Sequence, residues 1–415
     1  MTAPFDIVIL GLTVTSSWGN GHATTWRALI RGLALRGYRI LFLERDAPWY
    51  AENRDEPHPD GATTVIYESV EELIARFECV VSHAALVIVG SYVPDGIRIG
   101  EWATSVALGK CVFYDIDTPV TLARLEAGNA EYINPELIRR YHAYLSFTGG
   151  PTLRNIERRY GSPMARALYC SVDPEKYNPP RTPTYWDLGY LGTYSADRQP
   201  SLDALFIAPA RQWSKGRFAI AGPQYPETIS WPTNVERTIH LSPREHASFY
   251  GAQRFTLNIT REAMKKAGYS PSVRLFEAGA CGVPVISDCW EGLDRVFRIG
   301  EELLVAESAD DVLRYLRDFP ESARLRVAAG ARRRVLAEHT PVARALQLEH
   351  YLKEMNEHVS PGATWRDGCS GNIARGLETR LPSERDGKRA GAAACAVSLP
   401  GADRSNLHEP TRTCR

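Results

Sequence analysis

Residues 268–288 read G-Y-S-P-S-V-R-L-F-E-A-G-A-C-G-V-P-V-I-S-D, and this stretch decides how the rest of the chain is interpreted. It predicts a loop, a short apolar helix and a buried strand. Ser270 can cap the helix, because its hydroxyl can accept a hydrogen bond from a free amide one turn in, and Pro271 suits the first helical position. Gly282 ends the helix and Pro284 prevents its return.

The start of this predicted helix has the chemistry to hold a phosphate. Free amides and the positive end of the helix dipole favour an anion there, and Arg274 lies in the first turn. Glu277 lies farther along the same apolar run, and a buried carboxylate needs a partner. Paired ribose hydroxyls are one such partner, and a structural salt bridge with a nearby arginine is the other.

The stretch resembles the carboxy-terminal signature of group 1 GT-B glycosyltransferases, and among these it is most similar to the CgeB-like, spore-maturation family. The matching residues are the runs 268–278 (G-Y-S-P-S-V-R-L-F-E-A), 280–284 (A-C-G-V-P) and 290–293 (W-E-G-L), with Ser287, Asp288, Gly300 and Glu301. Similar runs extend over most of residues 1–351: 17–22 (S-W-G-N-G-H), 42–46 (F-L-E-R-D) with Trp49 and Tyr50, 114–119 (Y-D-I-D-T-P), 189–192 (G-Y-L-G) and 261–264 (R-E-A-M).

The chain departs from the group 1 pattern at one position. That pattern has two glutamates separated by seven residues, of which the second corresponds to Glu277. The first position is occupied by Tyr269. The contact that the first glutamate makes with the donor sugar in the family is therefore not carried over to this chain.

Composition bounds the function. The 415 residues contain 49 Lys and Arg against 49 Asp and Glu, so net charge gives no reason to expect a nucleic acid or an anionic membrane as partner. The eight cysteines show no zinc or C-x-x-C spacing, and several lie in apolar patterns, which predicts buried thiols in a reducing cytoplasm. Residues 1–12 read as a first strand and not as a signal peptide, and no apolar run is long enough for a transmembrane helix.

Alternating strand and helix patterns predict an α/β protein with two Rossmann-like domains of the GT-B type, which face a cleft. The expected parts are a first domain over residues 1–173, a proline-rich linker over 174–184, a second domain over 185–338, a final helix over 339–358 and a disordered tail over 359–415. The resemblance implies that the final helix crosses back to the first domain. The expected strands are 5–12, 38–44, 64–67, 85–89, 110–114, 144–148 and 165–169, then 186–191, 217–221, 235–241, 255–259, 283–287 and 303–305.

The second domain is expected to bind the donor. Ligands of open parallel sheets bind at the carboxyl ends of the strands, where glycines let a backbone approach a phosphate and arginines neutralise it. The backbone near residues 240–243 would hold the nucleotide base, as the resemblance implies. The predicted donor-binding residues are Gly192, Thr193, Tyr194, Arg198, Gly222, His240, Pro243, Arg261, Ser270, Pro271, Ser272, Arg274 and Glu277.

The first domain is expected to bind the acceptor. His22 follows a glycine-bearing loop and lies near a helix start, where the positive dipole end lowers the imidazole pKa and keeps it neutral. A neutral histidine can deprotonate an acceptor hydroxyl, and Asp115 and Asp117 could orient it. His22 and Asp117 are thus the predicted catalytic pair of an inverting transfer, whereas a retaining transfer needs no such base. The predicted acceptor-binding residues are Trp18, Gly19, Asn20, Gly21 and Asp115.

Three other interpretations stay open at this stage. In the first, a dinucleotide-dependent oxidoreductase would use Glu44, at the end of the second strand, to bind a ribose. In the second, Asp115 and Asp117 form a D-x-D motif that holds Mn²⁺ or Mg²⁺, as in single-domain glycosyltransferases. In the third, the chain binds a nucleotide sugar or glycan without transferring anything.

The sequence therefore predicts a soluble, cytoplasmic, metal-independent glycosyltransferase without a cofactor. It would move a sugar from a nucleotide-activated donor to a hydroxyl-bearing glycan, protein or small molecule. Nucleic acid is not an expected partner, and neither the nucleotide base nor the stereochemical outcome is predicted.

Overall fold

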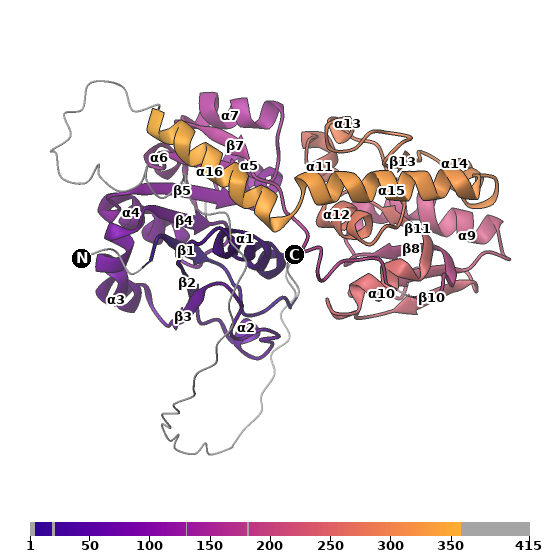
Figure 1. The fold of residues 1–415 in the computed structure, drawn as a ribbon, viewed down its shortest axis with the longest axis horizontal. Helices are drawn as coiled ribbons and strands as arrows, with labels where there is room; N and C mark the ends of the chain where they lie inside the picture. The colour runs from indigo at the N-terminus through magenta and orange to yellow at the C-terminus, as the bar shows by residue number, and fades with distance from the viewer. Residues whose placement is uncertain (1–4, 19–20, 130, 181, 358–415) are drawn as a thin grey trace, which may run out of the picture. The chain divides into compact units, whose positions relative to one another are not determined.

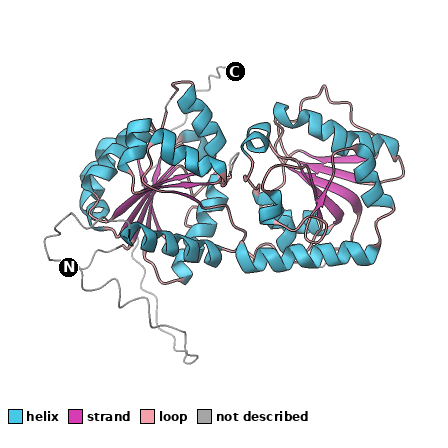
Figure 2. Cartoon of the chain, turned by 90° about the horizontal axis from the view of Figure 1, so that it is seen from above, coloured by secondary structure: helices cyan, strands magenta, loops and turns pink. Residues whose placement is uncertain are grey.

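The computed structural model describes residues 5–18, 21–129, 131–180 and 182–357, and residues 1–360 belong to one compact unit. Two parallel sheets form its framework, each with helices on both sides, as Figure 1 and Figure 2 show. The predicted tail lies outside the described residues, as do Gly19 and Asn20. No helix in the described part of the chain is long and apolar enough to cross a membrane.

The first sheet has seven parallel strands in the order β3-β2-β1-β4-β5-β6-β7. Its central strands read as continuous apolar runs because helices cover both faces, and every residue of the first strand is buried. The bounds are β1 Ile7–Gly11, β2 Ile40–Arg45, β3 Thr63–Tyr67, β4 Leu86–Gly90, β5 Lys110–Asp115, β6 Ala143–Ser146 and β7 Ala165–Ala167.

The second sheet repeats the same winding with six parallel strands, in the order β10-β9-β8-β11-β12-β13. In both sheets the chain starts in the middle, winds to one edge and then returns to build the other side. The order therefore reverses next to β1 and next to β8, which is where doubly wound sheets bind ligands. The bounds are β8 Trp186–Leu191, β9 Phe218–Ala221, β10 Val235–Thr238, β11 Gln253–Asn258, β12 Val285–Ser287 and β13 Leu304–Val305.

The helices cover these sheets. Around the first sheet they are α1 His22–Leu35, α2 Pro48–Ala51, α3 Val70–His83, α4 Gly96–Val106, α5 Thr118–Glu126, α6 Pro135–Arg140 and α7 Pro151–Tyr160. The second half contains α8 Gln199–Leu202, α9 Ala208–Gln212, α10 His246–Gly251, α11 Glu262–Ala267, α12 Val273–Ala280, α13 Leu293–Val296, α14 Ala309–Arg317, α15 Glu321–Glu338 and α16 Pro341–Glu357. A 3₁₀ turn over Ala196–Arg198 precedes α8, and a π-helical turn over Asp203–Ile207 joins α8 to α9.

The last helix, α16, returns to the first sheet and packs against α1 (Figure 1). The guanidinium of Arg36 donates to both carboxylate oxygens of Glu349, at 2.9 and 3.0 Å. The two helices approach so closely that a Cβ at Gly32 would lie 2.1 Å from the carbonyl oxygen of Pro341. This return completes the predicted GT-B arrangement, and the fold class is confirmed.

Several predicted boundaries were wrong. The central helix begins at Val273 with Ser272 as its N-cap, so Pro271 is not its first residue and Ser270 does not cap it. The sequence pattern predicts a mainly helical stretch over residues 202–213, but the helical stretch begins earlier, at Gln199, and contains the π-helical turn. The helices α5 and α11 were not predicted, because each is short and follows directly on a polar strand end.

Candidate active site

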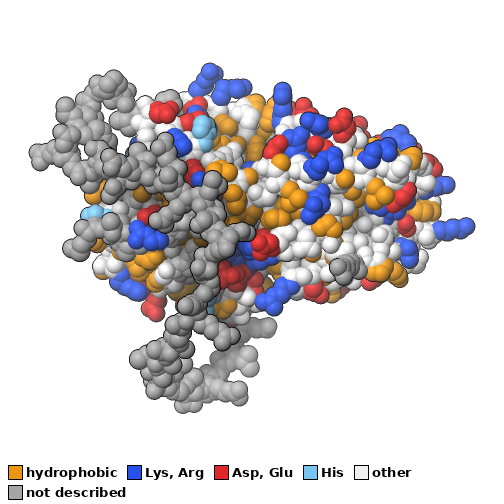
Figure 3. Space-filling model, in the orientation of Figure 1, with side chains coloured by type: hydrophobic (Ala, Val, Ile, Leu, Met, Phe, Trp, Pro, Cys, Tyr) orange, Lys and Arg blue, Asp and Glu red, His pale blue; other side chains and the backbone are white. Residues whose placement is uncertain are grey.

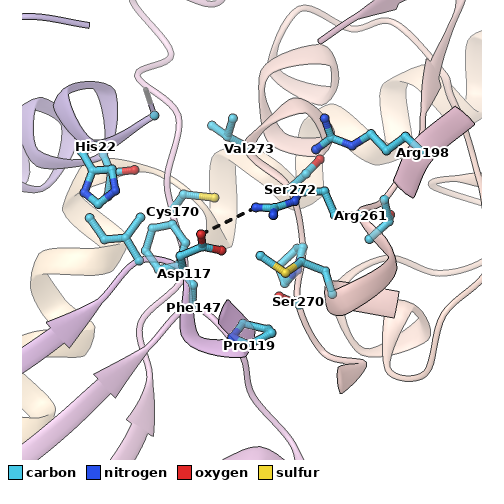
Figure 4. Close-up of a pocket in the computed structure, with 16 residues that line it drawn as sticks. His22, Asp117, Pro119, Phe147, Cys170, Arg198, Arg261, Ser270, Ser272 and Val273 are labelled. Atoms are coloured by element: carbon cyan, nitrogen blue, oxygen red, sulfur yellow. Dashed lines mark ion pairs between the residues drawn. The ribbon is translucent and has the colours of Figure 1, made fainter. Parts of the chain in front are cut away.

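A pocket of about 250 Å³ lies at the carboxyl ends of both sheets and is lined by residues from both halves of the chain (Figure 4). The first half contributes residues from the start of α1 and from the ends of β5 and β6. The second half contributes the 3₁₀ turn, the loop after β11 and the start of α12. The lining comprises Gly21, His22, Thr25, Ile116, Asp117, Pro119, Phe147, Cys170, Arg198, Thr260, Arg261, Met264, Ser270, Pro271, Ser272 and Val273.

His22 is the first residue of α1, and its imidazole is almost fully buried. Burial lowers its pKa from 6.5 to about 4, so the ring is neutral at pH 7. The prediction of a neutral histidine therefore agrees with this direction of shift, and its cause is burial. The ring of Tyr92 packs edge-on against the imidazole at 5.3 Å between centroids.

Asp115, which ends β5, does not reach the pocket. It is fully buried and accepts hydrogen bonds from the hydroxyls of Tyr144 and Thr121 and from the amide of Asp117. Burial raises its pKa to about 6. Its carboxylate holds the loop after β5 in place, and the predicted direct role in acceptor binding has no support in this geometry.

Asp117 does line the pocket. Its Oδ2 accepts a hydrogen bond from the hydroxyl of Tyr92 at 3.0 Å and lies 3.6 Å from Nη1 of Arg261. Its Oδ1 is buried and has no hydrogen-bond partner among the described residues. Burial raises the pKa of this carboxyl, and the charge of Arg261 opposes that rise. Tyr92 therefore contacts both members of the predicted catalytic pair, His22 through its ring and Asp117 through its hydroxyl.

Two arginines of the second half line the opposite wall. Arg261 immediately precedes α11 and faces Asp117, as the dashed line in Figure 4 marks. Arg198 donates to the carbonyl of Thr193 at 3.1 Å, while its Nε is buried without a hydrogen-bond partner among the described residues. Burial lowers the pKa of Arg198, and the nearby charges of Arg274 and Arg261 lower it further. Positive charge thus accumulates here without full compensation by carboxylates.

The start of α12 forms the floor between these walls. Ser270, Pro271, Ser272 and Val273 all line the pocket. The hydroxyl of Ser272 donates to Oδ1 of Asn258 at 2.7 Å and makes no capping bond to the first helical amides. The hydroxyl of Ser270 lies 3.0 Å from that of Thr148, across the two halves. Amides at a helix start that no side chain caps can hydrogen-bond an anion.

Arg274 and Glu277 lie behind the pocket wall, not in it. The guanidinium of Arg274 donates to the carbonyl of Leu191 and, at 2.8 Å, to Oδ1 of Asn258, so it ties the ends of β8 and β11 together. Its planar group lies over the ring of Tyr190 at 4.9 Å. Glu277 accepts a hydrogen bond from the hydroxyl of Tyr250 at 2.9 Å. Among the described residues it forms no ion pair with an arginine, so the salt-bridge interpretation of this carboxylate is wrong.

The remaining predicted donor residues are divided between two places. Gly192, Thr193, Tyr194 and Gly222 belong to adjoining loops after β8 and β9, where Tyr194 N donates to the carbonyl of Pro223 at 3.0 Å. Gly222 has φ +146°, and a Cβ there would lie 2.0 Å from the carbonyl oxygen of Gly192, so only glycine fits. His240 and Pro243 are exposed and do not line the pocket, although they stay predicted base-binding residues.

The predicted acceptor loop is only partly described. Gly21 lines the pocket, Trp18 is 53% exposed, and Gly19 and Asn20 lie outside the described residues. The sequence did not point to Tyr92, Phe147, Cys170 or Thr260. Tyr92 could have been found from its position, because it lies just after the apolar run that predicts β4, and this strand is next to the place where the strand order reverses. The other three carry no signal beyond their position after strands.

The structure removes the support for two of the other interpretations. Glu44 is fully buried and accepts hydrogen bonds from the hydroxyls and amides of residues 13–15, so its carboxylate fixes the β1–α1 loop and does not face a ribose. Of the two carboxylates of the D-x-D motif, Asp115 is engaged by hydrogen bonds inside the sheet and Asp117 alone lines the pocket. Among the described residues, no group of three or more His, Cys, Asp or Glu side chains could hold a metal ion.

The fold and this pocket define the class: the chain has the architecture of GT-B glycosyltransferases. Residues 198–350 match the model of the family described as "Glycosyl transferase-like", and the matched range includes Arg198, Arg261 and the start of α12. No protein of curated function matches the chain in sequence.

Solved structures agree on the fold. Sucrose-phosphate synthase from Thermosynechococcus elongatus is 15% identical with a TM-score of 0.60, covering 85% of this chain and 99% of that one. HepE of Anabaena, in complex with UDP and glucose, is 12% identical with a TM-score of 0.61, covering 84% of this chain and 100% of that one. AviGT4, a glycosyltransferase involved in avilamycin A biosynthesis, is 15% identical with a TM-score of 0.57, and the match covers 86% of this chain and 99% of that one.

Proposed function

We propose that the protein transfers a sugar from a nucleoside-diphosphate donor to a hydroxyl-bearing acceptor in the pocket between its two sheets. The observation that carries this proposal is the arrangement of charge around that pocket. Arg198, Arg261 and the uncapped start of α12 form one wall, and His22 and Asp117 form the other. A diphosphate fits the first wall, because arginines and helix-start amides both favour phosphate oxygens.

The second wall has groups that act on an acceptor hydroxyl. His22 is neutral and can accept a proton, and Asp117 offers a carboxylate oxygen without a protein partner among the described residues. In this role His22 removes the hydroxyl proton as the acceptor oxygen attacks the anomeric carbon, and the nucleoside diphosphate leaves toward the arginines. Positive charge on the donor wall stabilises the leaving diphosphate without a metal ion.

Three finer assignments belong to the same proposal. The CgeB-like family is the subgroup proposed, on the sequence runs that surround Glu277. Uridine diphosphate is the first nucleotide to test, because HepE of Anabaena was solved with UDP and glucose. A cytoplasmic site of action suits a chain whose buried Cys111, Cys170 and Cys281 are free thiols.

The deciding experiment is ligand-induced thermal stabilisation of the full chain with UDP, ADP, GDP, the corresponding nucleotide sugars and NAD(P). Each ligand is tested with and without EDTA, since a ligand that binds only the folded state raises Tm. We expect one nucleoside-diphosphate family to raise Tm regardless of EDTA. Stabilisation by NAD(P) alone would contradict the proposal, and a shift abolished by EDTA would restore the D-x-D interpretation.

Turnover separates an enzyme from a binding protein. The nucleotide sugar that stabilises the chain should be consumed with release of its nucleoside diphosphate, slowly with water and faster with an accepted alcohol. Arg261→Gln should abolish most of this release, whereas Arg317→Gln, an exposed arginine on α14, should leave it unchanged. Tight binding of the nucleotide sugar without release in any acceptor mixture would favour the non-catalytic interpretation.

A further inference from the structure

Arg261 and Asp117 form an ion pair across the pocket, with Nη1 and Oδ2 3.6 Å apart. The two residues come from different sheets, Asp117 from the loop after β5 and Arg261 from the loop after β11 (Figure 4). This pair therefore joins the donor wall to the acceptor wall.

The pair is loose compared with the other contacts of Asp117. Tyr92 donates a well-formed hydrogen bond to Oδ2 at 3.0 Å, whereas Arg261 approaches the same oxygen only to 3.6 Å. The Arg261 side chain is also 37% exposed. A guanidinium held by one long contact can turn to an anion that binds it more strongly than the single carboxylate does.

A diphosphate is that better anion. It carries more charge than one carboxylate, and its oxygens accept charge-assisted hydrogen bonds from a planar guanidinium. Arg198 supplies a second guanidinium on the same wall, whose buried Nε has no hydrogen-bond partner among the described residues. Arg261 would thus leave Asp117 when a diphosphate occupies the start of α12.

We propose that Arg261 is exchanged between Asp117 and the donor diphosphate, so that donor binding releases Asp117 to position the acceptor hydroxyl. This inference rests on the proposed function and adds the coupling between its two half-sites. While Arg261 neutralises Asp117, an acceptor hydroxyl has a weaker hydrogen-bond acceptor there. After the exchange, Tyr92 still orients Oδ2, and the acceptor binds beside a full carboxylate charge.

Other groups around Asp117 do not provide this exchange. The charge of Arg124, on α5, also acts on Asp117. However, Nη1 of Arg124 pairs with Oε2 of Glu131 at 2.6 Å, and Arg124 does not line the pocket. Asp115 is held inside the sheet, and the hydroxyl of Tyr92 is a neutral donor, so a diphosphate attracts it far less than it attracts a guanidinium. Among these groups, only Arg261 faces both the carboxylate and the proposed phosphate site.

The test is calorimetric titration of the full chain with inorganic pyrophosphate, which probes the diphosphate site whatever the nucleotide base. The exchange predicts that Asp117→Asn binds pyrophosphate about two- to fivefold more tightly than the native chain, because Arg261 no longer has to leave a carboxylate. Arg261→Gln should bind at least about tenfold more weakly, because a charge-assisted contact is lost.

The double variant separates the exchange from a general effect of charge. Removing any negative charge near an anion site favours the anion, but the exchange acts only through Arg261. Asp117→Asn should therefore improve affinity in the native background and have no effect in the Arg261→Gln background. Glu262→Gln, which removes an exposed neighbouring carboxylate on α11, is the matched control, and any gain that it gives should be the same in both backgrounds.

The outcomes are distinct. An unchanged affinity in Asp117→Asn, or an equal gain in both backgrounds, would overturn the exchange and leave the diphosphate site standing. Failure of the native chain to bind pyrophosphate at all would overturn the donor wall itself, and with it the proposed function. Melting temperatures of the five variants, measured alongside, show that each is folded.

Discussion

The ring of Tyr269 lies directly against Gly292, such that a Cβ on Gly292 would be 2.3 Å from Cδ1 of the tyrosine. On its other side the ring meets Gly150 equally closely, and the amide of Gly149 donates to the carbonyl of Tyr269 at 2.9 Å. Tyr269 itself has φ +47°, a conformation that costs a bulky residue energy. The residue at the first-glutamate position of the group 1 pattern thus joins the two halves of the chain through a slot made of glycines.

Gly292→Ala should therefore lower the free energy of unfolding by more than the same substitution at a glycine with a similar positive φ but free space around it. Gly292 has φ +87°, and Gly300 has φ +84° with no atom within 4 Å of an added Cβ. Gly300→Ala should cost about 1–2 kcal/mol from backbone strain, and Gly292→Ala about 1–3 kcal/mol more from the clash. Urea unfolding of both variants measures the difference. Equal losses would show that the Tyr269 slot contributes nothing to stability.

Glu44 should be important for stability and not for ligand binding. Glu44→Ala leaves the amides of Val14 and Thr15 and two hydroxyls without their buried acceptor. We expect a loss of about 3–5 kcal/mol in the free energy of unfolding. The exposed Glu52→Ala should cost less than about 0.5 kcal/mol. The contrary outcome has two parts: Glu44→Ala is as stable as the native chain, and it loses binding of a dinucleotide that the native chain binds. That outcome would restore the oxidoreductase interpretation.

Acid should destabilise the protein partly through His22. The pKa of His22 is about 4 in the folded chain against 6.5 for a free histidine, so between these values the unfolded chain binds more protons. The stabilisation from a neutral His22 is complete above pH 6.5 and is lost as pH falls toward 4. The native chain should lose about 2 kcal/mol from this residue between pH 7 and pH 5.

A variant isolates that contribution. His22→Gln cannot titrate, so its unfolding free energy should fall by about 2 kcal/mol less than that of the native chain over the same pH range. Asp115, whose raised pKa of about 6 acts with the opposite sign, is present in both proteins and cancels. Identical pH profiles of the two proteins would mean that His22 is not buried as a neutral group.

Tyr250 should affect donor binding through Glu277. Its hydroxyl holds one oxygen of that buried carboxylate. If Glu277 binds the donor ribose, as the family resemblance implies, Tyr250→Phe leaves the carboxylate less well oriented for that contact. UDP binding measured by calorimetry should weaken about fivefold, which corresponds to the loss of about 1 kcal/mol. Tyr315→Phe is the matched control: Tyr315, on α14, donates its hydroxyl to the carbonyl of Val305 in β13, and neither residue lines the pocket, so UDP affinity should stay unchanged. Equal affinity in all three proteins would make Glu277 a purely structural residue.

The sequence by itself determined the fold class, because apolar runs separated by helical patterns have few ways to bury their surface other than parallel sheets covered by helices. It also predicted the neutral state of His22 and the polar strand ends where Asp117 and Arg261 lie. Helix starts were less well predicted, since Ser270, Pro271 and Ser272 are all acceptable residues there and local preferences differ by little.

Only the tertiary structure decided which of the candidate side chains face the pocket. Asp115 and Asp117 are two residues apart and look equivalent in sequence, yet the hydroxyls of Tyr144 and Thr121 enclose the first while the second faces Arg261. Glu44 likewise accepts its hydrogen bonds from the β1–α1 loop, and Glu277 accepts one from Tyr250 on α10. The physical reason is that a buried charge takes whatever donors the packed chain places beside it, and those donors are far away in the sequence.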